Sequence, residues 1–294
     1  MNKNESFIEL ITQKKLDGFV EQNIGFSSNI FMVFGLPTCK VKDNPFVWEK
    51  KTSLCNLTIQ RHPKYEIPYG CYARMNQIFI DTEVKTKSTN VIDVGQSFSE
   101  YMKKLNYNRG KANKTLLKQL LNYITSVIRV EPVNTSKSHF VGLQTLVAKA
   151  WDIYFSVENP DQLMLSKGKI VLDEAYAKYI YKHSVPLDLD LVHCLKRNPL
   201  ALDFYRFLAY RNNNLNRTIS FPDHLLFEQL GTEQQNDRVV RARLKDILHA
   251  IQHYWPVQAK FEDGFFEMKP SCSIIKKKIP TCSSDIKIIT ALVN

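Results

Sequence analysis

The sequence lacks the patterns by which membrane, secreted and metal-binding proteins are most readily recognised. It contains no run of about 18 apolar residues, so no membrane-spanning helix is expected. Residues 1–15 mix acidic and lysine side chains without an apolar core, which does not resemble a signal peptide. None of the six cysteines forms a Cys-x-x-Cys pair, so we expect free thiols in a reducing compartment, the cytoplasm, rather than a zinc or dithiol site.

Catalytic motifs are missing as well. A rolling-circle nickase or relaxase needs a His-hydrophobic-His metal pair near a nucleophilic tyrosine, and none of the seven histidines forms one. His249 and His253 have helical i, i+4 spacing, which could hold a metal, but they lack the glutamate of a His-Glu-x-x-His motif, and surface histidines are the commoner explanation. Lys167–Lys169 lacks the glycines of a phosphate-binding loop. We therefore predict no enzyme, no metal and no cofactor.

Acidic side chains are absent from one long stretch. Residues 101–130 contain no Asp or Glu but seven cations, in a chain of 294 residues with a net charge of +11 and a pI near 9.2. These cations are Lys103, Lys104, Arg109, Lys111, Lys114, Lys118 and Arg129. Such a balance indicates a polyanionic partner, with nucleic acid the first candidate and an anionic membrane surface the second.

The acid-free stretch also predicts a helix-turn-helix. Ser97–Leu105 reads as a short helix and Asn106–Gly110 as a turn. A second helix follows, with Leu116, Leu117, Leu120, Leu121 and Ile124 on one side at helical spacing. Its other face mixes cations, which suit phosphates, with hydroxyl and amide groups, which suit base edges. An ordinary solvated helix would look similar, but the missing acid and the preceding turn favour DNA contacts by Arg109, Lys111, Lys114, Thr115, Lys118, Gln119 and Asn122.

Two strand-like segments follow this helix. Ser126–Val133 alternates loosely, and Leu146–Val157 alternates well through Trp151, Ile153 and Phe155. A helix-turn-helix followed by a two-stranded hairpin is a winged helix. We expect Lys137, in the polar loop between the strands, to be a backbone contact of the wing.

The second half of the chain repeats this order of elements. Gln234–Tyr254 predicts a long helix with a buried apolar stripe, followed by a hairpin around Asp263–Gly264. Acidic neighbours dilute its charge, so a surface helix and a second DNA-reading helix are about equally supported. The candidate contacts on this helix are Arg238, Arg241, Lys245, His249 and Gln252.

These elements predict an α+β protein of two winged-helix domains in tandem. The expected boundaries are an N-terminal extension at 1–43, a first winged helix at 44–165, a second at 166–270 and a basic tail at 271–294. In the hypothesis, residues 111–122 enter one major groove and residues 238–252 enter the next. Two modules on one chain raise affinity through effective concentration.

The joint order of several short segments resembles the plasmid-encoded RepA replication initiators. The segments that carry this resemblance are Gly35–Cys39, Phe46–Glu49, Ile67–Gly70, Thr82–Ser88, Ser97–Met102, Val185–Leu189 and Leu195–Tyr205. The resemblance implies a protein with two winged helices that binds repeats at the replication origin, helps to open adjacent AT-rich duplex and controls plasmid copy number. It further implies recruitment of the host helicase and chromosomal initiator, and dimers that repress the protein's own gene. The acidic Glu262–Gly264 segment departs from a phosphate-binding second wing.

Two other functions stay open at this point. A sequence-specific autorepressor without initiator activity would need the same DNA-binding face, so the residues do not separate it from an initiator. RNA binding is weaker, because no aromatic stacking motif is evident on a predicted sheet.

Overall fold

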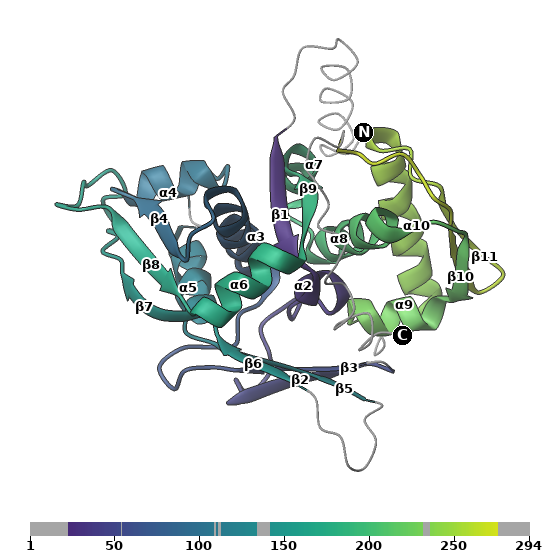
Figure 1. The fold of residues 1–294 in the computed structure, drawn as a ribbon, viewed down its shortest axis with the longest axis horizontal. Coiled ribbons are helices and arrows are strands. Elements are labelled where there is room, and N and C mark those ends of the chain that lie inside the picture. Colours follow the sequence, from purple (N-terminus) through teal and green to yellow (C-terminus); the bar gives the residue numbers. More distant parts are fainter. Residues whose placement is uncertain are drawn as a thin grey trace, which may run out of the picture. The chain divides into compact units, whose positions relative to one another are not determined.

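The computed structural model describes residues 23–53, 55–108, 110, 113–133, 142–231 and 236–275, which form two compact units (Figure 1). Among these residues, the N-terminal unit comprises 26–28 and 36–184, and the C-terminal unit comprises 23–25, 29–35 and 185–275. The predicted domain boundaries stay a prediction, although the N-terminal unit continues to Ser184 by its contacts. Most of the expected extension and most of the basic tail lie outside the described residues, as do Arg109, Lys111 and Lys137.

The N-terminal unit is built on a winged helix. Its helices α4 and α5 form the predicted helix-turn-helix, and Ser97 caps α4 by accepting a hydrogen bond from the backbone N of Glu100. Three antiparallel strands complete it in the order β4-β8-β7. The elements are α3 (Gly70–Lys87), β4 (Val91–Gly95), α4 (Phe98–Lys104), α5 (Asn113–Ile124), β7 (Ala148–Asp152) and β8 (Gly168–Leu172).

A second sheet is inserted into this unit. Its four antiparallel strands have the order β2-β3-β5-β6, and they are β2 (Val47–Lys51), β3 (Cys55–Gln60), β5 (Val127–Pro132) and β6 (Leu143–Leu146). Alternate residues on neighbouring strands, such as Ile59 and its partner Ile128, are buried on one face of this sheet. The apolar alternation of these strands therefore serves a separate sheet and not the winged helix.

This insertion corrects two predictions. Leu146–Val157 is not one strand, because the chain leaves β6 at Leu146 and enters β7, in the other sheet, at Ala148. The hairpin of β5 and β6, whose loop contains Lys137, belongs to the four-stranded sheet. The wing of the first winged helix is instead the β7–β8 connection, residues 153–167.

The C-terminal unit repeats the winged-helix topology without the insertion. Its strands have the order β10-β12-β11, which matches β4-β8-β7 position for position, and both pairings are antiparallel. Asp263 and Gly264, both with positive φ, close the predicted β11–β12 hairpin. The repeated elements are α8 (Pro199–Asn214), β10 (Ile219–Pro222), α9 (Asp223–Leu230), α10 (Asp237–Tyr254), β11 (Ala259–Glu262) and β12 (Phe265–Met268).

The remaining elements belong to neither winged-helix module. Asp173 caps α6 (Glu174–His183) by accepting hydrogen bonds from the backbone N of Ala175 and Tyr176. A two-stranded sheet pairs β1 (Ile24–Ser28) with β9 (Ser184–Asp188). The short helices are α2 (Asn29–Val33), α6 (Glu174–His183) and α7 (Leu189–Leu195). Within the described ranges, no helix is both long and apolar enough to cross a membrane.

Each winged helix has its own core. Leu116, Leu120 and Tyr123 of α5 are fully buried where α5 packs against α3. In the C-terminal unit, an aromatic cluster of Phe204, Phe261 and Phe266 joins α8 to the hairpin, with ring centroids 4.9–6.1 Å apart. The protein is thus an α+β chain of tandem winged helices, as the sequence predicts.

Candidate nucleic-acid interface

Helix α5, the second helix of the first helix-turn-helix, presents a narrow outward face. Its buried positions surround most of the helix circumference: Asn113, Leu116, Gln119, Leu120, Asn122, Tyr123 and Ile124. At 100° per residue, the outward direction falls on Lys114, Lys118 and Leu121. Both lysines are exposed, whereas Leu121 and its neighbour Leu117 are partly exposed and do not belong to the core stripe predicted for them.

Gln119 and Asn122 do not fit the predicted role as base readers. Both side chains are fully buried. The Gln119 Oε1 accepts a hydrogen bond from the backbone N of Tyr69 at 2.9 Å, and the Asn122 Oδ1 accepts one from the backbone N of Glu66 at 3.1 Å. Because buried amides must satisfy backbone groups nearby, these two side chains fix the loop before α3 to the side of α5 and are not available to a base edge.

Lys118 is exposed but already has an anionic partner. Its Nζ lies 2.9 Å from the Glu66 Oε1, which also accepts a hydrogen bond from the Lys40 Nζ at 3.0 Å. Burial alone would raise the pKa of the Glu66 carboxyl, but the two ammonium groups outweigh it and lower the pKa below its usual range. Glu66 therefore stays ionised beside the outward face of α5.

Lys114 and Thr115 stand at the start of the same helix. Lys114 is exposed, and no carboxylate of the described residues forms an ion pair with it. Thr115 is partly exposed next to it. Of the predicted contacts on α5, these two and Lys118 are therefore accessible to a ligand.

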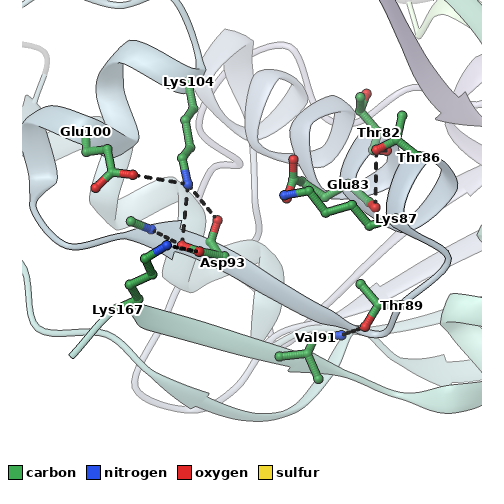
Figure 2. A network of polar contacts seen from close by, with 11 residues as sticks. Thr82, Glu83, Thr86, Lys87, Thr89, Val91, Asp93, Glu100, Lys104 and Lys167 are labelled. Carbon is green, nitrogen blue, oxygen red and sulfur yellow. Dashed lines mark hydrogen bonds and ion pairs between the residues drawn. The ribbon is translucent and has the colours of Figure 1, made fainter.

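The first wing is held by an ionic cluster at its base. Figure 2 shows Asp93 of β4 between Lys104, at the end of α4, and Lys167, the residue before β8. The Lys104 Nζ lies 3.4 Å from the Asp93 Oδ1 and the Lys167 Nζ lies 3.3 Å from the Oδ2. Burial alone would raise the pKa of Asp93, but the hydrogen bond from Gly95 and the two cations lower it. Both lysines are thus engaged in fixing the wing to the helix-turn-helix.

The tip of the first wing is apolar and acidic. Residues 153–166 contain Glu158 and Asp161 and no cation. Tyr154, Leu163 and Leu165 are 72%, 72% and 109% exposed. Phosphate contacts come from cations or from neutral donors, and this wing offers only neutral donors, such as the Tyr154 hydroxyl and the Gln162 amide.

Helix α10 offers fewer free cations than its sequence indicates. The Arg241 Nε donates to the Asp223 carboxylate at the start of α9, and the Gln252 Nε2 donates to the carbonyls of Val257 and Ala259, each at 3.0 Å. These two predicted contacts therefore hold the winged helix together. Arg238, Lys245 and His249 are exposed and stay candidates.

The second wing is acidic, as the sequence indicates. The Lys260 ammonium is paired with Glu262, and the Lys269 Nζ lies 3.6 Å from the Glu267 Oε1. Phe265 at the turn is 48% exposed. Neither wing presents an unpaired cation at its tip, so an interface with DNA would rest on the outward faces of α5 and α10.

No group of three or more histidine, cysteine or acidic side chains within the described ranges could hold a metal ion. His249 and His253 instead face each other across one turn of α10, with ring centroids 4.5 Å apart. The residue that sequence reasoning missed is Glu66. Nothing local to Lys118 signals this partner, because the loop that carries Glu66 meets α5 only in the folded chain.

Comparisons with known proteins agree with this architecture. Two crystal structures of domains 2 and 3 of RctB are similar, with TM-scores of 0.53 and 0.52. They share 9% sequence identity with the chain, cover 81% and 80% of it, and are each covered to 95%. At this identity the likeness concerns the fold alone. No curated protein sequence matches the chain.

The sequence itself matches a family model. The model described as "Plasmid encoded RepA protein" matches residues 67–221, which is more than half of the chain. The match runs from the loop before α3, through both helices of the first helix-turn-helix, to β10 of the second winged helix. The chain therefore belongs to the family of plasmid-encoded RepA proteins, and with it to plasmid replication initiation.

Proposed function

We propose that the protein binds repeated sequences in the double-stranded origin of its plasmid, with α5 and α10 each entering a major groove, and that this binding starts replication. The observation that carries the proposal is the outward face of α5. There, Lys114 and Lys118 stand on the second helix of a helix-turn-helix, in a stretch of thirty residues without acid. The family membership supports the same function.

Lysines at this position favour a phosphate-directed component of binding. Each phosphate that a protein neutralises releases counterions, so the affinity falls steeply with salt concentration. Sequence selectivity must come from groups that reach base edges in the groove. Thr115 on α5, and Arg238, Lys245 and His249 on α10, are the accessible polar candidates.

The tandem arrangement supports tight binding by a single chain. Once one winged helix has bound, the other is held at a high effective concentration near its own site. Dimers, opening of AT-rich duplex and recruitment of the host helicase and chromosomal initiator belong to the proposal as expectations of the family. Repression of the protein's own gene would use the same DNA-binding face.

The test is binding of the full chain to origin DNA of its plasmid, compared with a scrambled duplex of equal length at two salt concentrations. We expect origin-selective binding that survives physiological salt. We expect the Lys114→Ala variant to weaken binding to both duplexes and to reduce the salt slope by about one. The matched control is Leu163→Ala in the first wing, which should leave binding unchanged.

Equal and salt-sensitive binding to both duplexes would contradict the proposal, since it would leave only a basic surface. If binding is origin-selective, a strand-opening assay on supercoiled origin DNA distinguishes the two roles. An initiator opens the duplex, whereas a pure autorepressor binds without opening it.

A further inference from the structure

We propose that the protein selects its DNA sites through the methyl groups of thymine, contacted by Leu117 and Leu121 of α5 and by Val239 and Ala242 of α10. The inference deepens the proposed function, on which it rests, by naming the base that the outward faces recognise. It follows from the side chains that are accessible on these faces, since Gln119 and Asn122 are buried and cannot contact DNA.

On α5, leucine occupies the centre of the outward face. Lys114, Lys118 and Leu121 point within about 60° of one another around the helix axis, and Leu117 lies at the edge of this sector. Leu121 lies one turn beyond Lys118 on this strip and is partly exposed, although the neighbouring Leu120 is fully buried. A partly exposed leucine on a strip that also carries two exposed lysines contributes less to the core than a fully buried one, so its position suggests contact with a ligand.

On α10, the same arrangement recurs. The buried positions are Val240, Leu244, Leu248 and Ile251. The opposite side exposes Arg238, Val239, Ala242, Asp246 and His249, with Val239 at 47% exposure. Both helices therefore carry apolar side chains beside charged ones on the side away from their cores, and on α10 the charged ones include Asp246 as well as Arg238.

The chemistry of the major groove identifies what such a face can read. Thymine is the base that presents a methyl group there, and small or apolar side chains contact it. Cations on the same face can reach phosphates on either side of the groove. Because Gln119 and Asn122 are buried and bonded to the backbone of the loop before α3, α5 presents no amide side chain that could read adenine. Leucine, lysine and Thr115 remain on its accessible side.

Replacement of thymine by uracil tests the inference, because it removes the methyl group and leaves base pairing unchanged. The probe is a duplex of about 30 base pairs, selected by the full chain from a random-sequence library, and the same duplex with uracil at one thymine position after another. We expect a few positions at which uracil weakens binding by about fourfold each, the loss expected for one buried methyl group. All other positions should show no change.

Protein variants connect these positions to the side chains. The variant Leu117→Ala/Leu121→Ala should bind the thymine duplex more weakly and lose its sensitivity to uracil at the positions that α5 reads. Val239→Ser should do so at a second set of positions. Lys114→Ala is the matched control, since it should weaken binding to the thymine and uracil duplexes by the same factor. Circular dichroism of each variant confirms that the fold is intact.

The outcomes distinguish a failure of the thymine inference from a failure of the proposed DNA-binding function. If the wild-type chain binds uracil and thymine duplexes equally, or if the leucine variant keeps its full uracil sensitivity, the inference is wrong. If Lys114→Ala and Lys118→Ala bind every duplex like the wild type, the proposed entry of α5 into the groove is wrong as well. If the leucine variant instead changes self-association without DNA and keeps its thymine preference, the outward leucines serve a protein contact and the inference fails.

Discussion

In the N-terminal unit, helix α5 is fixed from one side by a loop that precedes the winged helix, through Gln119, Asn122 and Lys118. In the C-terminal unit, α10 is fixed by its own module, through Arg241 to α9 and Gln252 to the base of the hairpin. Each module therefore uses polar side chains predicted for DNA to hold its helix in place. The comparison teaches that a polar helix face has two uses, and that the neighbouring element decides which residues remain for a ligand.

The largest effect should come from the cores that hold the two helices. Leu120→Ala in α5 and Leu244→Ala in α10, both at fully buried positions, should each lower the free energy of unfolding by about 2–5 kcal/mol. Leu121→Ala should cost clearly less, because Leu121 is partly exposed. Urea unfolding followed by circular dichroism measures all three. A cost for Leu121→Ala equal to that of Leu120→Ala would place Leu121 in the core.

A smaller effect distinguishes the two units by pH. Burial, assisted by Lys196, lowers the pKa of His193 in the C-terminal unit from 6.5 to about 4. As pH falls below 6.5, the unfolded chain binds a proton that the folded chain excludes, so stability is lost between about pH 6.5 and 4. The full loss is about 3 kcal/mol. Urea unfolding across this range measures it.

Two variants control the pH experiment. His193→Gln should remove this pH-dependent loss, and His249→Gln, at an exposed position on α10, should leave it in place.

Glu66 in the N-terminal unit stabilises the fold in its ionised form, since the two lysines lower the pKa of its carboxyl. Its contribution is present above the unfolded value, near 4.3, and is lost at more acidic pH. If the loss of stability between pH 6.5 and 4 persists in His193→Gln, its assignment to His193 is wrong.

The next largest effect distinguishes the roles of two arginines on α10. Arg241→Ala leaves the buried Asp223 carboxylate without this partner and should cost about 1–3 kcal/mol of stability. Arg238→Ala, at an exposed position, should stay within about 0.5 kcal/mol of the wild type and weaken DNA binding instead. Thermal unfolding and DNA titration of both variants test the distinction. Weaker binding by Arg241→Ala at unchanged stability would return Arg241 to the interface.

The smallest effect concerns Glu66 and DNA affinity. Glu66→Gln removes the charge that pairs with Lys118, so DNA binding should tighten a few-fold and the slope of log affinity against log salt should steepen by about 0.9. The control is Glu49→Gln, which removes the same negative charge at a different place, because Glu49 is an exposed carboxylate on β2 paired with Lys51. Equal tightening in both variants would indicate a general charge effect.

Much of the fold could be read from local signals. The helix expected from Ser97 begins with Ser97 as its cap, the long helix expected at 234–254 forms as α10, and the hairpin turn lies at Asp263–Gly264 as the sequence indicates. These signals act between near neighbours in the chain. They predict where helices and turns begin and end.

Pairing between distant strands could not be read in the same way. The apolar alternation around Leu146 correctly indicates strands. It does not reveal that β6 pairs with β5 in one sheet while β7 pairs with β8 in another. Likewise, the pattern on α5 does not reveal that the loop at Glu66–Tyr69 covers one polar side of the helix. Which of the accessible residues touch DNA stays a prediction.

If Lys118 contacts DNA as proposed, Glu66 has a kinetic consequence. A carboxylate that pairs with Lys118 when DNA is absent competes with every phosphate that approaches this lysine, whatever the base sequence. On random DNA, where no base contact compensates, such an internal competitor shortens the dwell time and lets the protein leave quickly. On a cognate repeat, base contacts offset the exchange. The side chain would thus speed the search for the origin, at some expense of affinity.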